Sequence, residues 1–487
     1  MRNIFYERFF NTPKKQFRIL TIKERNQVSV YAVCCGKYVL NSFYAAWCML
    51  CSIMEIYWNK SVETMEREQI RAIQLERLRS TVQNVYASVP YYRDKMKEKG
   101  LLPGDIKTLD NLRDLPITTK QDLRDTYPFG LFAVPMEEIV RVHASSGTTG
   151  KQTVVGYTRK DIDIWAECMA RCLAMEGADK SSRVQVAYGY GLFTGGLGAH
   201  YGTEKLGAVA IPASSGNTQR QITMMIDFGV THLCCTPSYA MNIAEVLWDI
   251  GHTKDDLKLK AGCFGAEPWS DGMRAEIENR LGIRAYDIYG LSEIMGPAVS
   301  HECRYQNGLH IWEDCFIPEI TDADTDLPVK DGEAGDLVIT TVNKEGFPLI
   351  RYKTRDICTI NYEPCECGRA HARMSKPAGR TDDMLIIRGV NVFPSQIESA
   401  LLTVGEVQPH YQIIVDRINN LDTLTVNIEI SEGMFTDNIR GIEDFEKKVG
   451  NQINSVLGIN AKIRLVEPKS IARSEGKAKR VIDKRKI

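Results

Sequence analysis

The chain has 487 residues, of which 25% are charged, and its formal net charge is -1. A chain of this length is too long for one compact hydrophobic core, so we expect two or three domains. The near-neutral charge excludes a strong bulk attraction to nucleic acid or anionic lipid. Fourteen cysteines without a convincing secretion signal predict free thiols or metal ligands in a reducing compartment, so we expect a cytoplasmic protein.

The first 53 residues differ from the rest of the chain. Residues 1–27 are basic, and we expect them to be irregular, whereas residues 28–56 are apolar with polar interruptions. A membrane-spanning helix needs about 20 predominantly apolar residues. The run 38–53 is marginal by that measure, and it lies too deep for an ordinary signal peptide. We predict an appendage, or an upstream mis-start, before a globular part that begins near Met54; a membrane anchor is the less favoured alternative.

Helical and strand patterns alternate in the globular part. Apolar residues recur at helical spacing over residues 66–85 and predict an amphipathic helix, which Pro90 follows. Short apolar runs further on predict buried strands, most of them followed by Gly, Pro or Ser and then a helical stretch: Val184–Ala187, Ala208–Ile211, His232–Cys235, Ala261–Phe264 and Ala285–Ile288. This alternation predicts an α/β fold with a wound parallel sheet. Ligands bind such sheets in the loops at the carboxyl ends of the strands.

A loop rich in hydroxyls and glycines precedes these strands, and its residues are Ser145, Ser146, Gly147, Thr148, Thr149, Gly150 and Lys151. Its backbone N–H groups and hydroxyls can surround a polyphosphate, and the lysine supplies positive charge. The Walker pattern needs Gly six residues before the Lys and Ser or Thr directly after it. This chain has Ser145 and Gln152 at those positions, so the loop indicates another kind of ATP chemistry. The alternative is a solvated surface turn.

The loops after the predicted strands carry the other unusual motifs. Aromatic residues alternate with glycines over 188–196, where the backbone can approach a ligand and the rings offer flat apolar walls; a glycine-rich turn with core aromatics is the alternative. The small-residue loop 265–268 can lie flat against a purine. Glu293 can hold Mg²⁺ through its oxygens, or it is an exposed residue at a helix start. Asp356 can accept two hydrogen bonds from the hydroxyls of a ribose.

A cysteine motif stands apart from these loops. Cys365 and Cys367 are separated by one residue, and His371 follows closely. Two thiolates and an imidazole are typical of part of a structural Zn²⁺ site, which needs a fourth ligand from elsewhere. Cys303 is our first choice for that ligand, and His301 and His310 are the next candidates. The alternative is a loop of reduced surface thiols.

The order of these motifs resembles the adenylate-forming superfamily, which includes acyl-CoA synthetases. The segments 188–196, 308–314 and 384–394 are similar more narrowly to phenylacetate–CoA ligases. This resemblance extends from about Met54 to the C-terminus. It implies a large N-terminal adenylation domain over residues 54–381 and a small mobile α+β domain over residues 382–487, with a hinge at Asp382. In the small domain we expect strands near Gln412–Val415 and Thr423–Ile430 and a helix near Ile439–Leu457.

The same resemblance implies a nucleotide site for ATP. Residues 145–151 would cradle the β- and γ-phosphates, and Glu293 would hold Mg²⁺. The remaining implied nucleotide-binding residues are Gly265, Ala266, Glu267, Pro268, Asp287, Tyr289, Gly290, Ser292, Asp356 and Arg380. Lys477 would bridge the acid and the α-phosphate, as a cation placed where negative charge accumulates. The residues before its glycine depart from the superfamily's Pro-Arg-Thr pattern.

The resemblance also implies the acid and thiol sites. Tyr188, Phe193, Ala266 and Pro297 would form an aryl-shaped acid pocket, and Arg388 and Gly389 would line the channel for coenzyme A after the small domain swings about its hinge. Phenylacetate, indoleacetate, hydroxyphenylacetate and benzoate all remain open as the acid. We expect an AMP-forming acid–thiol ligase, with a carrier-protein-loading enzyme or a non-catalytic binding protein as alternatives. We further expect a homodimer without nucleic-acid or membrane partners.

Overall fold

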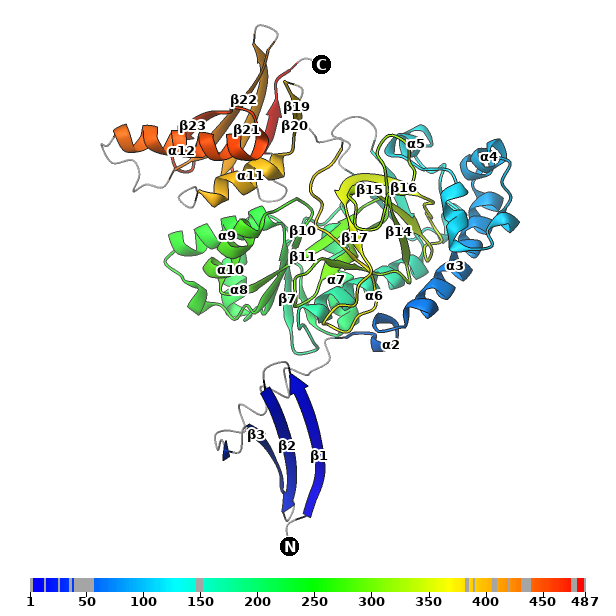
Figure 1. Ribbon diagram of the computed structural model, residues 1–487, viewed down its shortest axis with the longest axis horizontal. Helices are drawn as coiled ribbons and strands as arrows, with labels where there is room; N and C mark the ends of the chain where they lie inside the picture. Colours follow the sequence, from blue (N-terminus) through cyan, green and yellow to red (C-terminus); the bar gives the residue numbers. More distant parts are fainter. Residues whose placement is uncertain are drawn as a thin grey trace. The chain divides into compact units, whose positions relative to one another are not determined.

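The computed structural model describes residues 3–12, 15–24, 27–34, 37–38, 57–145, 152–381, 385–388, 390–404, 410–418, 421–430, 439–473 and 480–485. The chain divides into two compact units, residues 1–56 and 57–487 (Figure 1). In the part of the chain that is described, no helix combines the length and apolar character needed to cross a membrane.

The first unit is an antiparallel meander of four strands. They are β1 (Asn3–Thr12), β2 (Lys15–Glu24), β3 (Gln27–Cys34) and β4 (Lys37–Tyr38), paired in chain order. The expectation of irregular structure before Gln27 is therefore wrong. The segment is rich in Ile, Phe, Tyr, Thr and Val, which favour strands.

Helices open the second unit. They are α2 (Lys60–Glu63), α3 (Arg67–Ser88), α4 (Pro90–Glu98), η1 (Pro103–Asp105), η2 (Leu109–Asp114), α5 (Lys120–Asp125) and η3 (Met136–Glu138). The helix predicted over 66–85 is confirmed as α3, which buries Leu78, Val82 and Val85 on one face. Pro90 begins α4 at its first position, where the missing proline N–H costs no helical hydrogen bond.

A nine-stranded sheet forms the centre of this unit, in the order β17-β18-β13-β12-β11-β10-β9-β7-β8. Five of its strands run parallel to one another: β7 (Arg183–Val186), β8 (Val209–Ile211), β9 (His232–Cys235), β10 (Ala261–Gly265) and β11 (Arg284–Leu291). All five predicted strands are confirmed. Antiparallel strands extend the sheet beyond β11: β12 (Met295–Glu302), β13 (Leu309–Ile311), β18 (Arg373–Met374) and β17 (Ile360–Asn361).

Helices cover both faces of the parallel strands. They are α6 (Arg159–Met175), α7 (Gly195–Leu206), α8 (Thr218–Asp227), α9 (Pro237–Asp249) and α10 (Asp271–Leu281), and the short η4 (Lys254–Asp256) follows α9 in the chain. Alternate residues of β9 join different cores: Cys234 packs with α6 and α7, whereas Leu233 and Cys235 pack with α8, α9 and α10. Because both faces are covered, the strands read as continuous apolar runs.

Two smaller sheets complete the large part of the unit. One is antiparallel and consists of β14 (Phe316–Thr321), β15 (Gly335–Thr341) and β16 (Tyr352–Cys358). The other pairs β5 (Arg141–Ala144) with β6 (Val154–Tyr157), on either side of the predicted phosphate loop. The carboxyl ends of β10 and β11 and the strand β16 together frame the site described below.

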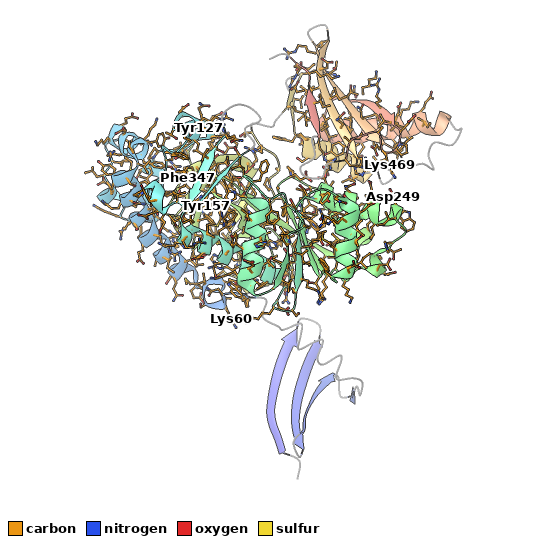
Figure 2. The ribbon with its side chains drawn as sticks, turned by 180° about the vertical axis from the view of Figure 1, so that it is seen from behind. Lys60, Tyr127, Tyr157, Asp249, Phe347 and Lys469 are labelled. Carbon is orange, nitrogen blue, oxygen red and sulfur yellow. The ribbon has the colours of Figure 1, made fainter. Side chains whose placement is uncertain are left out.

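The C-terminal part has an α+β fold and its own core. The hairpin β19 (Leu385–Ile387) and β20 (Val390–Val392) precedes α11 (Pro394–Thr403), β21 (Tyr411–Ile418), β22 (Leu421–Glu429), α12 (Ile439–Leu457), β23 (Lys462–Val466) and β24 (Val481–Asp483). Ile397 of α11 and Val449 of α12 pack against Ile413 and Val426 of the sheet. The two strands and the helix predicted here are confirmed. Lys469 Nζ lies 2.7 Å from Asp249 of α9 (Figure 2).

Candidate active site

A cavity of about 240 Å³ opens at the carboxyl ends of β10 and β11. Residues from β16 and from the segment 376–380 close it on the other side. The lining residues include Lys120, Ala266, Glu267, Pro268, Trp269, Asp287, Tyr289, Gly290, Glu293, Asp356, Lys376, Gly379 and Arg380. Much of the nucleotide-binding set predicted from the sequence thus lies around one hollow.

The loop after β10 forms a small-residue wall. A Cβ on Gly265 would lie 2.2 Å from the carbonyl oxygen of Ile288, so only glycine permits this approach of β10 to β11. Ala266 adopts a left-handed backbone, with φ at +70°. The backbone N–H of Ser238 donates to Glu267 Oε1 at 2.8 Å and anchors the loop to the start of α9. The resulting surface suits the flat face of a purine.

Asp356 stands at the centre of a second group. The hydroxyl of Tyr289 donates to Asp356 Oδ2 at 2.5 Å, and Arg380 Nε lies 3.5 Å from Asp356 Oδ1. Burial raises the pKa of Tyr289 well above its usual value, so its hydroxyl stays protonated and remains a donor. The backbones of Asp356 and Arg380 also pair directly. A fixed carboxylate beside a guanidinium can hold a vicinal diol and an adjacent anion.

Glu293 is connected to the phosphate loop by a residue that no motif indicated. Thr153 Oγ1 donates to Glu293 Oε1 at 3.1 Å and lies 2.8 Å from Ser145 Oγ. The backbone N–H of Thr153 also donates to Ser145 Oγ at 3.1 Å. Glu293 is 6% exposed. A buried carboxylate at the edge of a cavity is a suitable oxygen ligand for Mg²⁺. Residues 146–151 lie outside the described residues.

Lys344 binds the backbone of the segment that carries Glu293. Its ammonium donates to the carbonyl oxygens of Glu293 at 3.3 Å and Ile294 at 2.8 Å. It also lies over the rings of Tyr157 at 4.5 Å and Phe347 at 5.2 Å, both labelled in Figure 2. Burial lowers the pKa of Lys344 to about 8. No residue near Lys344 in the sequence marks it as part of the site, so the sequence did not predict it.

Asp287 and Ser292 occupy distinct positions near the cavity. Asp287 lines it, and burial, reinforced by the nearby Glu302, raises the pKa of Asp287 to about 6. The backbone N–H of Asp287 donates to Glu302 at 2.8 Å. Ser292 Oγ lies 3.3 Å from Thr194 Oγ1, which connects the loop after β11 to the glycine-rich loop 188–196.

The four residues predicted for the acid pocket differ in setting. Ala266 lines the cavity, whereas Tyr188 is buried and its hydroxyl lies 3.4 Å from the carbonyl oxygen of Cys263. Pro297 accepts a 2.8 Å hydrogen bond from the indole of Trp165 through its carbonyl. Phe193 is 53% exposed. The structure does not bring Phe193 into a closed wall with the other three, although Ser292 and Thr194 hold its loop at the end of β11.

The predicted thiol and hinge residues lie mostly beyond the described residues. Asp382, Gly389 and Lys477 all fall there. Arg388 is exposed, and its Nε donates to the carbonyl oxygen of Asp422 at 2.8 Å within the C-terminal part. Their roles therefore stay predictions.

The cysteine motif has a different histidine from the one the sequence suggested. Cys303, Cys365 and Cys367 lie together with His310. The predicted ligand His371 faces elsewhere: its Nδ1 accepts from the backbone N–H of Glu313 at 3.1 Å. The choice of His371 is corrected to His310. His301, the other histidine considered as a fourth ligand, belongs to a separate buried group, where its Nε2 lies 2.8 Å from Glu176 Oε1.

Comparison with known proteins agrees with this geometry. The family described as "AMP-binding enzyme" matches residues 46–343, and "AMP-binding enzyme C-terminal domain" matches residues 389–485. Phenylacetate-coenzyme A ligase from Thermus thermophilus is 47% identical over 443 residues, covering 88% of this chain and 100% of the relative. The ligase of the same name from Escherichia coli is 49% identical, covering 88% and 97%. The chain belongs to the phenylacetate–CoA ligase family.

The structure of this family member also resembles solved structures of another acyl-CoA ligase. A structure of 2-hydroxyisobutyryl-CoA ligase in the postadenylation state, in complex with 2-HIB-AMP, overlaps with a TM-score of 0.84 at 31% identity. The match covers 89% of this chain and 93% of that one. The same ligase in the thioesterification state, with 2-HIB-AMP and CoA, overlaps with a TM-score of 0.66 at 32% identity, covering 88% and 92%. The adenylate-forming fold is thereby confirmed.

Proposed function

We propose that this family member is an AMP-forming ligase that converts an aryl acid, phenylacetate or a close aryl-acetate, to its coenzyme A thioester. The observation that carries the proposal is the cavity at the carboxyl ends of β10 and β11. It combines a small-residue wall, the Asp356–Tyr289–Arg380 group and the buried Glu293. The identity of 47–49% with phenylacetate-coenzyme A ligases supports the acid chosen.

The chemistry has two steps. A carboxylate is a poor acceptor for a thiol, because oxide is a poor leaving group. One carboxylate oxygen attacks the α-phosphorus of ATP, and the bond to the β-phosphate breaks, so that pyrophosphate leaves and an acyl-adenylate forms. The thiolate of coenzyme A then attacks the acyl carbon, and AMP leaves with the oxygen that came from the acid.

The residues around the cavity have proposed roles in the first step. The wall at Ala266 and Glu267 holds the adenine, and Asp356 accepts from the ribose hydroxyls while Arg380 balances its charge. Glu293 holds Mg²⁺, which when bound neutralises phosphate charge. Buried beside Thr153, the Glu293 carboxylate has one oxygen already engaged, which leaves the other for the ion or its water. Residues 145–151 surround the terminal phosphates.

Lys477, which acts in the first step, must leave the site before the second step. Lys477 would neutralise charge at the acid and the α-phosphate during adenylation, and there it would obstruct the incoming thiol. We propose that rotation of the C-terminal part about Asp382 withdraws Lys477 and presents Arg388 and Gly389 to coenzyme A. A homodimer and a cytoplasmic location remain predictions. The Zn²⁺ predicted at the cysteine motif has no part in this chemistry.

The test measures pyrophosphate release from the full chain with ATP, Mg²⁺ and phenylacetate, with and without coenzyme A. We expect release to depend on the acid and sustained turnover to depend on coenzyme A, with phenylacetyl-CoA appearing in equal amount to AMP. Adenylate without thioester would indicate a carrier protein as the acceptor. ATP binding without pyrophosphate release would exclude an enzyme of this class.

A further inference from the structure

Four side chains of the kinds that bind zinc converge at a point that lies apart from the nucleotide cavity. Cys303 Sγ lies 3.7 Å from Cys365 Sγ, and Cys367 Sγ lies 3.3 Å from His310 Nε2. All four ligand atoms lie within 4.8 Å of one another. We propose that these residues bind one structural Zn²⁺ ion, and that the ion closes the far end of the ribbon that carries the ribose site.

The distances fit a tetrahedral ion. Zinc bonds of about 2.3 Å to sulfur and about 2.0–2.1 Å to nitrogen place neighbouring sulfurs about 3.8 Å apart and sulfur and nitrogen about 3.6 Å apart. The observed separations of 3.7 Å and 3.3 Å are within a few tenths of an ångström of these values. A disulfide needs sulfurs about 2.05 Å apart and joins only two of three thiols. Three thiols and an imidazole around one point therefore suit an ion better than a covalent link.

The orientation of His310 favours ligation. Its Nδ1 lies 3.0 Å from the carbonyl oxygen of His371. A carbonyl only accepts, so Nδ1 carries the proton and Nε2 presents its lone pair to the three sulfurs. A backbone oxygen that fixes the tautomer of a histidine in this way is a common support for zinc ligands. His371 thus contributes its backbone to the site, and its ring contacts Glu313.

The proposed ion lies at one end of a two-stranded ribbon that leads to the nucleotide cavity. Cys365 and Cys367 lie in the connection between β17 and β18. Hydrogen bonds continue this pairing back to the nucleotide cavity: Ser375 N donates to the carbonyl oxygen of Thr359 at 3.0 Å. The ribbon ends at the bridge between Asp356 and Arg380. One end of the ribbon therefore holds the proposed ribose ligands, and the other end holds two of the four zinc ligands, Cys365 and Cys367.

The same connection is also held from the side of α2. The hydroxyl of Tyr57 donates to the carbonyl oxygen of Cys367 at 2.5 Å. Arg369 forms a fully buried ion pair with Glu63 at 2.7 Å. Because Cys303 directly follows β12 and His310 lies on the paired strand β13, a bound ion would join these two strands to a connection that is distant from them in sequence. Its loss should loosen the ribbon without removing any group that contacts substrate.

The first experiment measures the metal in the full chain, purified from zinc-replete cells. We expect about one zinc per chain by elemental analysis. Replacement by Co²⁺ should give the visible absorption of a tetrahedral cobalt–thiolate centre. His310→Ala and Cys367→Ser should lose the metal, whereas His310→Cys should retain it, because a thiolate can replace the imidazole.

Matched controls separate this site from other thiols. His371→Ala removes the histidine ring that the sequence suggested, and Cys168→Ser removes one member of a buried thiol pair whose sulfurs lie 3.8 Å apart. Both should retain one zinc. If His310→Ala does not fold, the cobalt spectrum of His310→Cys decides, because it should shift toward that of four thiolates.

The proposal would be overturned by any of three results. These are zinc-replete protein without stoichiometric zinc, equal zinc in folded His310→Ala and the native chain, and a Cys303–Cys365 disulfide in the unreduced protein. Binding of ATP provides the second readout for the ribbon. Removing zinc from the native chain should weaken ATP binding several-fold, and unchanged ATP affinity in zinc-free protein would overturn the coupling to the ribose site.

Discussion

Replacing Asp356 with asparagine removes the carboxylate from the group proposed to hold the ribose. The shape of the side chain is kept, and the amide oxygen can still accept from the hydroxyl of Tyr289, which donates to Asp356 Oδ2 at 2.5 Å in the native chain. Arg380, 3.5 Å from Oδ1, loses its counter-charge. The fold should therefore survive while ligand binding suffers.

The size of the effect follows from the lost bonds. A hydrogen bond to a charged acceptor is worth about 1.5–3 kcal/mol, and the asparagine presents an NH₂ group to one of the two ribose hydroxyls. We expect a loss of about 2–3 kcal/mol, which weakens ATP binding roughly 30- to 150-fold. Titration calorimetry with ATP measures this directly. Asp322→Asn, on an exposed turn after β14, is the matched control and should bind ATP as the native chain does.

A second ligand makes the test specific. ATP without its 2′ and 3′ hydroxyls should bind the native chain about as weakly as ATP binds Asp356→Asn, and the variant should lose little further affinity for it. The proposed role of Asp356 would be refuted if Asp356→Asn bound ATP within twofold of the native chain. It would also be refuted if the variant still discriminated fully between the two nucleotides.

Four further predictions concern catalysis, the acid pocket and stability. Lys477→Ala should abolish adenylate formation but leave thioester formation from added phenylacetyl-adenylate nearly intact; equal loss in the two half-reactions would contradict domain rotation. Phe193→Ala should raise KM for phenylacetate several-fold with KM for ATP unchanged, and its half-exposed ring should make little difference to the melting temperature. Arg369→Ala leaves Glu63 as a buried, unpaired charge and should cost about 3–5 kcal/mol in denaturant unfolding, most of it recovered when Glu63 is also replaced by Gln. Burial lowers the pKa of Lys344 from 10.5 to about 8, so the folded chain releases that proton first; its unfolding free energy should rise relative to Lys344→Met by about 2–3 kcal/mol between pH 7 and 10, and parallel pH profiles would contradict this.

The parallel strands could be predicted because each one is short, apolar and bounded by turn residues. Complete burial removes the need for alternation, so His232–Cys235 and Ala285–Ile288 stand out against their helical neighbours. The order of the strands could not be read in the same way. It depends on pairings between distant segments, such as that of β13 with β18. The strands β1 and β2 were missed because charged residues are interspersed along them.

The site was predictable where neighbouring residues form a motif. The loop 265–268 and the run 289–293 are continuous in sequence, and most of their residues line one cavity. Thr153 and Lys344 act as single residues, and only tertiary contacts bring them to Glu293. His371 was preferred to His310 because it follows Cys367 closely in sequence. The pairing of His310 with Arg373 across β13 and β18 brings the more distant histidine to the thiols.

In the proposed mechanism the acid is activated as an acyl-adenylate before the thiol attacks. Phenylacetate labelled with ¹⁸O in both carboxylate oxygens tests it, with mass spectrometry of every product after turnover with ATP and coenzyme A. We expect one ¹⁸O in AMP, one in the thioester carbonyl and none in pyrophosphate. Unlabelled AMP, or label in a phosphate released from the β- or γ-position, would contradict it.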